Sequence, residues 1–517
     1  MRGRRSPNWL RSPCGASRFR RRRPARRNHC RSPPAGANPV GEPATLLSLR
    51  RRSRVDGQLH VPAGVGSEDP AIASVCEDSR EVRVGALFCC VPGRVVDGHD
   101  FAAEAAAAGA AALLVERALP VALPQLVVRE ARAAVGPLAL AAAGSPQDHL
   151  ELVGVTGTNG KTTVVHLLSS ILECAGRRCV AVGTLSGALT TPRASDLARR
   201  LAAARAAGAA AAAVEVSSHG LSQKRVEGLR FAASAFTNLS PEHLDYHRDM
   251  EDYYRAKRTL FEDARSAVSV VCTDDRWGRR LAEELTGDVR RCSRADAGLL
   301  EAAADYSRIS WRRRQITLPL GGAHNVANAV VAATVADALG VGGGEIAEGL
   351  RRAPRLAGRF EVVAESPAAV IVDFAHSPAA LEQLLRAGRS LLAAHSRLTV
   401  VFGCGGERDE AKREAMGEIA SRLADRVIIT SDNPRGEDPA SIARAVLAGV
   451  EGDGADLELD RRRAIAVALG DAERGDVVIV AGKGHETRQI IGGRSLPFDD
   501  AAVVRELLRG RSEVATA

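Results

Sequence analysis

Residues 154–163 read Gly-Val-Thr-Gly-Thr-Asn-Gly-Lys-Thr-Thr, and this stretch decides the fold of the region around it. The apolar run 150–155 is typical of a buried strand, and the stretch 164–173 has a helical pattern. In a strand–glycine turn–helix unit, backbone N–H groups and the helix N-terminus face phosphates. Lys161 would reach the β- and γ-phosphate oxygens, and Thr162 would hold Mg²⁺. The stretch therefore predicts a nucleoside triphosphate site, against the alternative of an ordinary strand-to-helix turn.

A length of 517 residues exceeds what one hydrophobic core supports, so we expect two to four domains.

The charge of the chain is unevenly distributed. The net charge of the whole chain is +9. The first 54 residues hold 16 Arg, no Lys and one acidic residue, Glu42, and therefore carry a charge of +15. The remaining chain carries −6, and a mildly acidic body argues against a nucleic-acid partner.

The segment 1–54 is rich in Arg, Pro and Ser and cannot bury a core, so we predict a disordered tail. It lacks the apolar stretch of a signal peptide. Three explanations stay open: a start site assigned too far upstream, which we favour, a transit peptide, or a nucleic-acid-binding arm.

Cysteine usage and hydropathy indicate the compartment. The ten cysteines form no Cys-x-x-Cys pair, which favours buried, reduced thiols in a cytoplasmic protein. The alanine-rich stretch 201–216 is interrupted by Arg205 and Gly208, so we interpret it as a helix followed by a strand. We therefore expect a cytoplasmic protein without membrane insertion. We also expect a monomer.

Strand and helix patterns alternate after the tail, which predicts an α/β protein of three domains. A small α/β domain would span 55–147, a doubly wound parallel-sheet domain with the phosphate loop 148–350, and a Rossmann-like domain 351–517. The expected strands are 71–75, 86–91, 112–116, 150–155, 179–183, 211–216, 233–237, 370–373, 398–402, 426–430 and 477–481, and the expected helices include 101–108, 164–173, 196–207 and 325–339.

Two sets of polar residues near the phosphate loop could bind a metal. Glu215 ends an expected strand, where a Mg²⁺ ligand belongs, although a helix cap or a surface glutamate is the alternative. His243 and His247 are four residues apart, so we expect them on one helix face. They could bind a metal there, or belong to a segment that caps helix ends.

Two polar loops follow expected strands of the third domain, namely Asp432-Asn433-Pro434-Arg435 and Gly482-Lys483-Gly484-His485-Glu486. Doubly wound folds bind ligands at the carboxyl ends of their strands. An arginine there offers a planar fork to a carboxylate or phosphate, and Glu486 could accept an ammonium. For the first loop, an ordinary Asn-Pro turn is the alternative.

Several motifs occur together in the order typical of the Mur ligase family, and the chain resembles that family over residues 70–510. They are Thr-Gly-Thr-Asn-Gly-Lys-Thr-Thr at 156–163, Glu-Val-Ser-Ser-His-Gly-Leu at 215–221, Asn-Leu-Ser-Pro-Glu-His-Leu-Asp-Tyr-His at 238–247 and Tyr-Arg-Ala-Lys at 254–257. Asp-Ser-Arg at 78–80 is similar to the uridine-nucleotide segment of the family. The resemblance is to the branch that adds diaminopimelate to UDP-N-acetylmuramoyl-L-alanyl-D-glutamate.

This resemblance implies an ATP-dependent amide ligase of peptidoglycan precursor synthesis. It implies that ATP phosphorylates the γ-carboxylate of the D-glutamyl residue, and that the amine of the incoming amino acid attacks the acyl phosphate. The implied partners are small molecules: ATP with Mg²⁺, the UDP-muramoyl dipeptide and meso-diaminopimelate.

The resemblance also implies a role for individual residues. The ATP site would comprise Gly157, Thr158, Asn159, Gly160, Lys161, Thr162, Thr163, Asn325, Arg359 and Asp373. The UDP-muramoyl dipeptide site would comprise Ser79, Thr190, Thr191, Ser217, Gln223 and Arg225. The diaminopimelate site would comprise Arg408, Asp432, Asn433, Pro434, Arg435, Gly482 and Glu486. Thr162, Glu215 and His243 would hold magnesium, and the catalytic residues would be Lys161, Glu215, His243 and Lys257.

Lys257 matches a lysine that carries CO₂ as a carbamate in this family, an N6-carboxylysine. An ammonium would repel Mg²⁺, whereas a carbamate is an anion. Carbamate formation requires a neutral amine, so we expect a depressed pKa at Lys257.

The third-domain arginines favour diaminopimelate over lysine. Diaminopimelate ends in a carboxylate and an ammonium, which arginines and Glu486 complement, whereas lysine ends in an ammonium alone. Losing one buried charge-paired contact costs about 2–5 kcal/mol, or about 30- to 5000-fold in affinity. The alternatives are a lysine-adding ligase, another Mur or folylpolyglutamate-type ligase, and a nucleic-acid-binding P-loop NTPase.

Overall fold

The computed structural model describes residues 44–516 except 66, 94, 263–264 and 453–454, with side chains to residue 510. Residues 1–43 of the predicted tail therefore lie outside the described part. The prediction of disorder is wrong for α1 (Leu46–Ser53), which begins at a Thr45 cap. Leu46 and Leu49 are fully buried there, so a short amphipathic pattern outweighed the basic composition.

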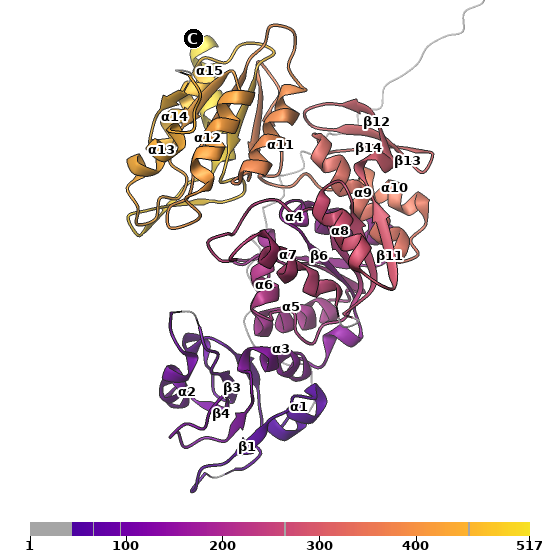
Figure 1. Cartoon of the computed structure of the whole chain (residues 1–517), viewed down its shortest axis with the longest axis vertical. Coiled ribbons are helices and arrows are strands. Elements are labelled where there is room, and N and C mark those ends of the chain that lie inside the picture. Colours follow the sequence, from indigo (N-terminus) through magenta and orange to yellow (C-terminus); the bar gives the residue numbers. More distant parts are fainter. Residues whose placement is uncertain (1–43, 66, 94, 263–264, 453–454, 517) are drawn as a thin grey trace, which may run out of the picture. The chain divides into compact units, whose positions relative to one another are not determined.

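The first sheet has the order β1 (Gln58–His60), β5 (Gln125–Val127), β4 (Ala110–Val115), β3 (Ala86–Cys89), β2 (Ser74–Cys76). α1 and α3 (Ala131–Ala142) pack on one face. α2 (Ala102–Ala107) covers the other face, which gives the small α/β layer that the sequence predicts (Figure 1).

The second sheet is fully parallel, in the order β11 (Asp288–Cys292), β10 (Ser266–Cys272), β9 (Phe231–Phe236), β6 (Glu151–Thr156), β8 (Ala211–Glu215), β7 (Cys179–Val182). α4 (Lys161–Cys174), α9 (Ala323–Ala338) and α10 (Gly343–Arg351) cover one face. α5 (Ala194–Ala206), α6 (Ser218–Ser222), α7 (Met250–Arg258) and α8 (Arg276–Glu284) cover the other. The loops after β6 and β8 thus lead to helices on opposite faces, which opens a ligand-binding crevice at this edge.

The sequence analysis missed an antiparallel sheet of β12 (Ala297–Ala302), β13 (Ser307–Trp311) and β14 (Arg314–Leu318). β13 and β14 do alternate buried and exposed residues, which is a strand signal. Their two-residue turn is Arg312-Arg313, and both residues have positive φ values of 44° and 64°. Asn-Gly or Asp-Gly normally occupies such turns, so the arginines concealed the hairpin.

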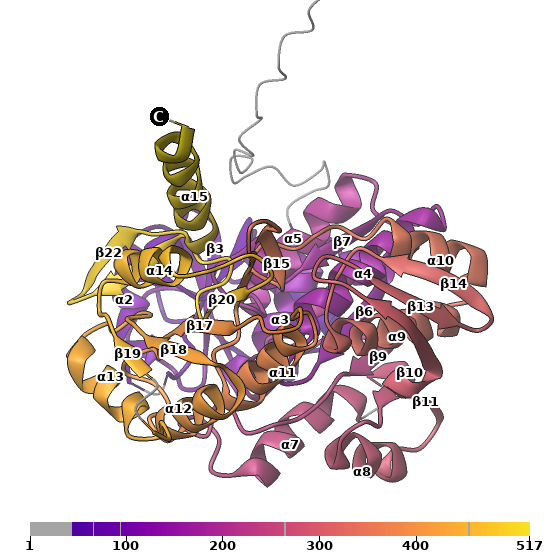
Figure 2. The ribbon, with the colours of Figure 1, turned by 90° about the horizontal axis from the view of Figure 1, so that it is seen from above.

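The last large sheet has the order β15 (Glu361–Ala364), β16 (Ala369–Asp373), β20 (Val477–Ala481), β17 (Leu398–Phe402), β18 (Arg426–Ile429), β19 (Ala455–Leu457). All pairs except β15–β16 are parallel. α11 (Pro378–Arg389), α12 (Lys412–Leu423) and α13 (Pro439–Leu447) cover one face, and α14 (Arg461–Gly470) and α15 (Asp500–Thr516) the other (Figure 2). β21 (Arg488–Ile491) and β22 (Arg494–Pro497) form a separate hairpin.

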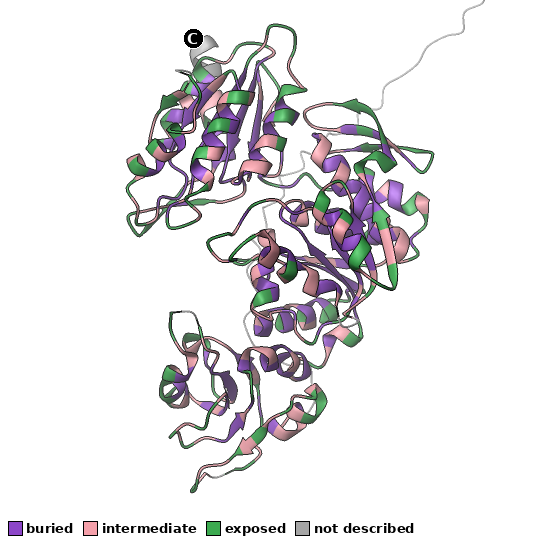
Figure 3. Cartoon of the chain, viewed as in Figure 1, coloured by how far each residue is buried: buried purple, intermediate pink, exposed green. Residues whose placement is uncertain are grey.

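The predicted α/β class with parallel sheets is confirmed. Buried residues concentrate on the strands, and the covering helices are buried along one side (Figure 3). The expected strands 398–402 and 477–481 coincide with β17 and β20, and the stretch 201–216 is a helix end followed by β8. Eight cysteines lie in the described part, where all are free thiols and all but Cys174 are buried. Among the described residues, no helix combines the length and apolar character that a membrane crossing requires.

Candidate active site

The turn between β6 and α4 has room only for glycine at two positions. Gly157 and Gly160 have φ values of 145° and 85°, in the range that other residues avoid. A Cβ atom at Gly157 would lie 1.9 Å from Thr237 Oγ1, and one at Gly160 would lie 2.2 Å from Asn328 Oδ1. The turn is therefore pressed against its neighbours, which fixes the direction of its backbone N–H groups.

Asn238 holds this turn from the side. Its carbonyl oxygen accepts a hydrogen bond from Thr158 N at 2.9 Å, and its Oδ1 accepts one from Asn159 N at 2.9 Å. Lys161 Nζ donates to the carbonyl oxygens of Gly157 and Thr158, both at 2.8 Å. Burial lowers the pKa of Lys161, because only neutral carbonyls contact its charge directly. A phosphate oxygen would be a better partner for this ammonium than a carbonyl oxygen.

Glu215, at the end of β8, points toward the start of α4. Its Oε2 accepts hydrogen bonds from Thr162 Oγ1 at 2.9 Å and Thr184 Oγ1 at 3.1 Å. Its Oε1 accepts one from Thr184 N at 2.9 Å. A Cβ atom at Gly183 would lie 2.0 Å from Oε1, so this glycine makes room for the carboxylate. The sequence analysis did not assign Thr184 a role, although its place directly after an expected strand was a usable signal.

The donor set beside α4 fits a magnesium ion. Thr162 and Glu215 supply oxygen atoms that already lie 2.9 Å apart, and both residues are buried. The described residues contain no cluster of three His, Cys, Asp or Glu side chains suited to a metal. Mg²⁺ commonly takes only one or two carboxylates and completes its shell with phosphate oxygens and water, so such a cluster is not required.

His243 and His247 do not share a helix face, so this prediction is wrong. Residues 243–247 form a single turn, in which the His243 carbonyl accepts from His247 N at 2.8 Å. α7 begins only at Met250, because Asp249 caps it by accepting from Asp252 N. Burial lowers the pKa of His243 to about 3, which leaves a neutral imidazole. Its place near the phosphate loop keeps it available as a metal ligand.

Lys257 is buried, and its amine contacts a carbonyl oxygen and an aromatic ring. Its side chain is buried, Nζ donates to Gly157 O at 2.8 Å, and Nζ lies 4.5 Å from the centroid of the Tyr253 ring. Burial, together with the charge of Lys161, lowers the pKa of Lys257 well below its usual value. The depressed pKa that the sequence predicts is therefore present.

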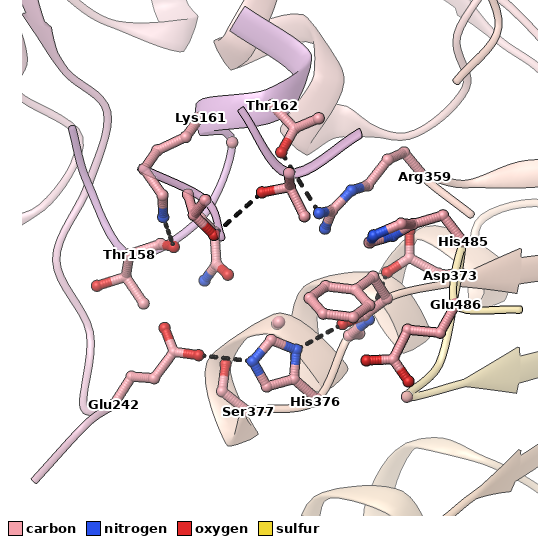
Figure 4. Close-up of a pocket in the computed structure, with 18 of the residues that line it drawn as sticks. Thr158, Lys161, Thr162, Glu242, Arg359, Asp373, His376, Ser377, His485 and Glu486 are labelled. Carbon is pink, nitrogen blue, oxygen red and sulfur yellow. Dashed lines mark hydrogen bonds and ion pairs between the residues drawn. The ribbon is translucent and has the colours of Figure 1, made fainter. Parts of the chain in front are cut away.

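Arg359 faces the phosphate turn from the segment that precedes β15. Its Nη2 donates to Thr162 Oγ1 at 3.4 Å, and its guanidinium lies 4.5 Å from the centroid of the Phe374 ring (Figure 4). Burial lowers its pKa, and its Nε has no hydrogen-bond partner in the described structure. The Asp373 carboxylate accepts from Phe360 N at 2.6 Å, which holds the residue after Arg359 in place.

The sequence analysis missed an ion pair between Glu242 and His376. Glu242 Oε1 lies 2.9 Å from His376 Nε2, and His376 Nδ1 lies 2.8 Å from Phe374 O (Figure 4). Burial opposes the charge of Glu242, but His376 outweighs it and holds the pKa below its usual value. The position of Glu242 inside the 238–247 motif was a signal for this role.

The loop Asp432–Arg435 is fixed by the hairpin that follows β20. Arg435 N donates to Ile490 O at 2.9 Å, and Gly492 N donates to Arg435 O at 2.6 Å. These bonds hold Arg435 at a positive φ of 56°, and its guanidinium donates to Gly406 O. A Cβ atom at Gly482 would lie 2.4 Å from Asp432 Oδ2, so the two polar loops are in close contact.

One cavity of about 600 Å³ brings most predicted residues together. Its lining includes Thr158, Asn159, Gly160, Lys161, Thr162, Thr163, Thr190, Glu215, His243, Asn325, Arg359, Asp373, Arg408, Asp432, Asn433, Arg435, Gly482 and Glu486. The phosphate turn and the polar loops of the last sheet thus share one chamber. The predicted residues outside this lining are Ser79, Gly157, Thr191, Ser217, Gln223, Arg225, Lys257 and Pro434.

Three family models match the chain in sequence: the Mur ligase family catalytic domain at residues 71–151, the Mur ligase middle domain at 155–336 and the Mur ligase glutamate ligase domain at 358–484. The chain belongs to the Mur ligase family. A protein of Streptomyces coelicolor named UDP-N-acetylmuramoyl-L-alanyl-D-glutamate--2,6-diaminopimelate ligase is 40% identical over 509 residues, covering 92% of this chain and 99% of that protein. A protein of the same name from Parasynechococcus marenigrum is 42% identical and covers 88% and 98%. A solved structure of a ligase with that name is 30% identical, with a TM-score of 0.59, and covers 86% and 96%.

Four predicted dipeptide-site residues of this Mur ligase form a network beside the cavity. Thr191 Oγ1 donates to Glu215 O at 2.8 Å and lies 3.1 Å from Ser217 Oγ. Arg225 donates to Thr191 O at 2.7 Å and to Gln223 Oε1 at 2.6 Å. Ser79 lies in a 3₁₀ turn of the first sheet region, where its neighbour Asp78 pairs with Arg193 at 3.0 Å.

The buried amine of Lys257 makes a pH-dependent contribution to the stability of the Mur ligase. In the unfolded chain it keeps its proton up to about pH 10.5, whereas the folded amine loses it at a lower pH. The unfolded state binds more protons in this interval, so the stability contribution rises with pH. We expect the Lys257→Met variant to gain most over the wild type at pH 7, and this gain to shrink toward pH 10.

Urea unfolding midpoints in CO₂-free buffer at several pH values measure this difference. The lost bond to Gly157 O shifts all midpoints alike and does not change the slope. The control Lys224→Met removes an exposed lysine that pairs with Glu130 at 2.8 Å, and its difference from the wild type stays flat. A flat difference for Lys257→Met as well would contradict the assignment.

Proposed function

We propose that this Mur ligase uses ATP to join meso-diaminopimelate to the D-glutamyl γ-carboxylate of UDP-N-acetylmuramoyl-L-alanyl-D-glutamate, in peptidoglycan precursor synthesis. One observation carries the proposal: Lys161 of the phosphate turn and the loop residues Arg435 and Glu486 line the same cavity. An activated acid and an amine can therefore meet there. The names of the sequence relatives support the same reaction.

The first step is the transfer of the γ-phosphoryl group of ATP to the carboxylate. Both reactants are anions, so the transfer needs cations and N–H donors around them. Lys161, Arg359 and the N–H groups at the start of α4 supply these. Thr162 and Glu215 would hold Mg²⁺, with His243 as a further ligand, and the ion would offset the charge on the phosphate oxygens.

The second step is the attack of the amine on the acyl phosphate, which forms the amide C–N bond and releases phosphate. The amino acid has to be held with its amine toward the phosphate turn. Arg408, Arg435 and Glu486 would bind the far end of diaminopimelate, with its carboxylate on the arginines and its ammonium on Glu486. Lysine offers no carboxylate to those arginines.

We further propose a cytoplasmic monomer with three domains at 55–147, 148–350 and 351–517, and no nucleic-acid partner. The substrates are small and polar, and the acidic body of the chain disfavours nucleic acid. The predicted dipeptide residues Ser79, Thr190, Thr191, Ser217, Gln223 and Arg225 would position the UDP-muramoyl dipeptide.

Phosphate release from ATP tests the proposed function directly. With the UDP-muramoyl dipeptide present, meso-diaminopimelate, L-lysine and D-alanyl-D-alanine are offered one at a time, and the nucleotide product is identified by mass. We expect turnover with diaminopimelate that exceeds turnover with lysine by at least about 30-fold. Equal use of lysine, or release only with D-alanyl-D-alanine, would overturn the assignment.

Arg435 should determine the preference for diaminopimelate. Arg435→Ala removes the guanidinium that would pair with the distal carboxylate, so kcat/KM for diaminopimelate should fall by about 30- to 5000-fold. The preference over lysine should then disappear. The matched control is Arg444→Ala, because Arg444 is exposed and lies outside the cavity lining. Unchanged selectivity in Arg435→Ala would contradict the role.

We predict that Lys257 reacts with CO₂ to form a carbamate. The lowered pKa of the buried amine favours this reaction, and the nearby charge of Lys161 would stabilise the anion formed. Protein incubated with ¹³C-bicarbonate should show a carbamate signal by NMR that is absent in Lys257→Met. Activity of the wild type should rise with bicarbonate. An unmodified Lys257 together with bicarbonate-independent activity would refute the prediction.

A further inference from the structure

Lys483 is a buried cation directly behind the proposed amino-acid site. It follows β20, its side chain has no exposed surface, and it is absent from the cavity lining. Its Nζ donates to Glu486 Oε2 at 2.9 Å, to Arg488 O at 2.7 Å and to Asn433 Oδ1 at 3.3 Å. An ammonium has three donors and no acceptor, so all of its hydrogen-bonding capacity is used.

Glu486 is held by this contact on one side only. Its Oε2 accepts from Lys483 and from Asn433 Nδ2, the latter at 2.7 Å. Ile490 N donates to Asn433 Oδ1 at 3.0 Å, which fixes the orientation of that amide. Among the described residues, nothing donates to Glu486 Oε1, and Glu486 lines the cavity (Figure 4). One carboxylate oxygen is therefore available to a ligand in the cavity, and the other contacts a fixed positive charge.

The contact also keeps Glu486 ionised. Burial would raise the pKa of this carboxyl group, but the charge and hydrogen bond of Lys483 outweigh burial and lower it. As a result, Glu486 presents a hydrogen-bond acceptor whose negative charge is already balanced by a neighbour.

We propose that Lys483 is a specificity-determining residue, which balances the charge of Glu486 so that the site accepts an amino acid ending in both a carboxylate and an ammonium. The inference rests on the proposed function. With Lys483 present, an ammonium alone gains little net attraction from the Lys483–Glu486 pair. Arg408 and Arg435, which also line the cavity, repel such an ammonium and attract a carboxylate.

Without Lys483, the site would be one unit more negative beside Glu486. A ligand with a terminal ammonium alone would then be attracted more strongly, and a distal carboxylate less strongly. Replacing the lysine by an apolar residue of similar length should therefore shift the preference from diaminopimelate toward lysine, rather than weaken both amino acids equally.

The loops on either side of Lys483 have a second support. Arg461 is fully buried and pairs with Asp500 through two hydrogen bonds of 2.7 Å. It also donates to Ala481 O at 2.9 Å and Ser431 O at 3.4 Å, directly before the two polar loops. The ends of β18 and β20 thus stay connected when Lys483 is changed, so a Lys483 variant can be tested as a folded protein.

The test compares kcat/KM for meso-diaminopimelate and L-lysine in the full-length wild type and Lys483→Met, with ATP and the UDP-muramoyl dipeptide saturating. We expect the diaminopimelate-to-lysine ratio to fall about 10- to 100-fold, through the KM of the amino acid, while the KM of ATP is unchanged. In the double variant Lys483→Met/Glu486→Gln both charges are removed, so any gain for lysine should disappear.

Lys224→Met is the matched control, because Lys224 lies outside the cavity lining and pairs with Glu130 at 2.8 Å without contacting Glu486. Its ratio should stay within about 3-fold of the wild type, below the effect of one charged hydrogen bond. Thermal unfolding checks that the variants fold. If Lys483→Met does not fold, Lys483→Gln should show a smaller shift in the same direction.

Two failures are distinguishable. A wild type that does not use diaminopimelate overturns the proposed function itself. A wild type that prefers diaminopimelate, with a Lys483 variant that loses both amino acids equally or shifts no more than Lys224→Met, overturns only the role of Lys483.

Discussion

The close approach of the phosphate turn to its neighbours is the constraint on which the site depends. At Gly157 and Gly160 a side chain would collide with Thr237 and Asn328, which belong to β9's end and to α9. Strand, turn and helix are therefore packed against each other without space for adjustment. The N–H groups of the turn keep one direction, and the donors at the end of β8 can be placed relative to them.

Cations in this region lack anionic contacts of their own. Burial lowers the pKa values of Lys161, Lys257 and Arg359, and their direct hydrogen-bond partners are carbonyl or hydroxyl oxygens. Such groups are costly to bury unless an anion is bound nearby. This cost would be offset at Lys161 and Arg359 by bound phosphate oxygens, and at Lys257 it lowers the pKa of the amine.

The fold and much of the site could be predicted because their signals are local. A buried strand followed by polar residues indicates the ligand edge of a parallel sheet, and Glu215 and the loop beginning at Asp432, which this signal singled out, line one cavity. Two kinds of feature could not be predicted. The Glu242–His376 pair depends on residues distant in sequence, which no motif links. The Arg312-Arg313 hairpin is local, but it depends on backbone angles that its composition conceals.

Sequence motifs describe the proposed amino-acid site incompletely, because buried charged residues lie behind its two loops. Arg435 and Glu486 line the cavity, but the backbone of their loops and the charge of Glu486 are set by Arg461 and Lys483, which lie outside the cavity lining. A cation that accepts no hydrogen bond and has every donor occupied cannot adapt when a ligand changes. Selectivity between two amino acids that differ by one carboxylate therefore depends on the charges of the residues that line the cavity and of the buried residues behind them. Only the first group lines the cavity.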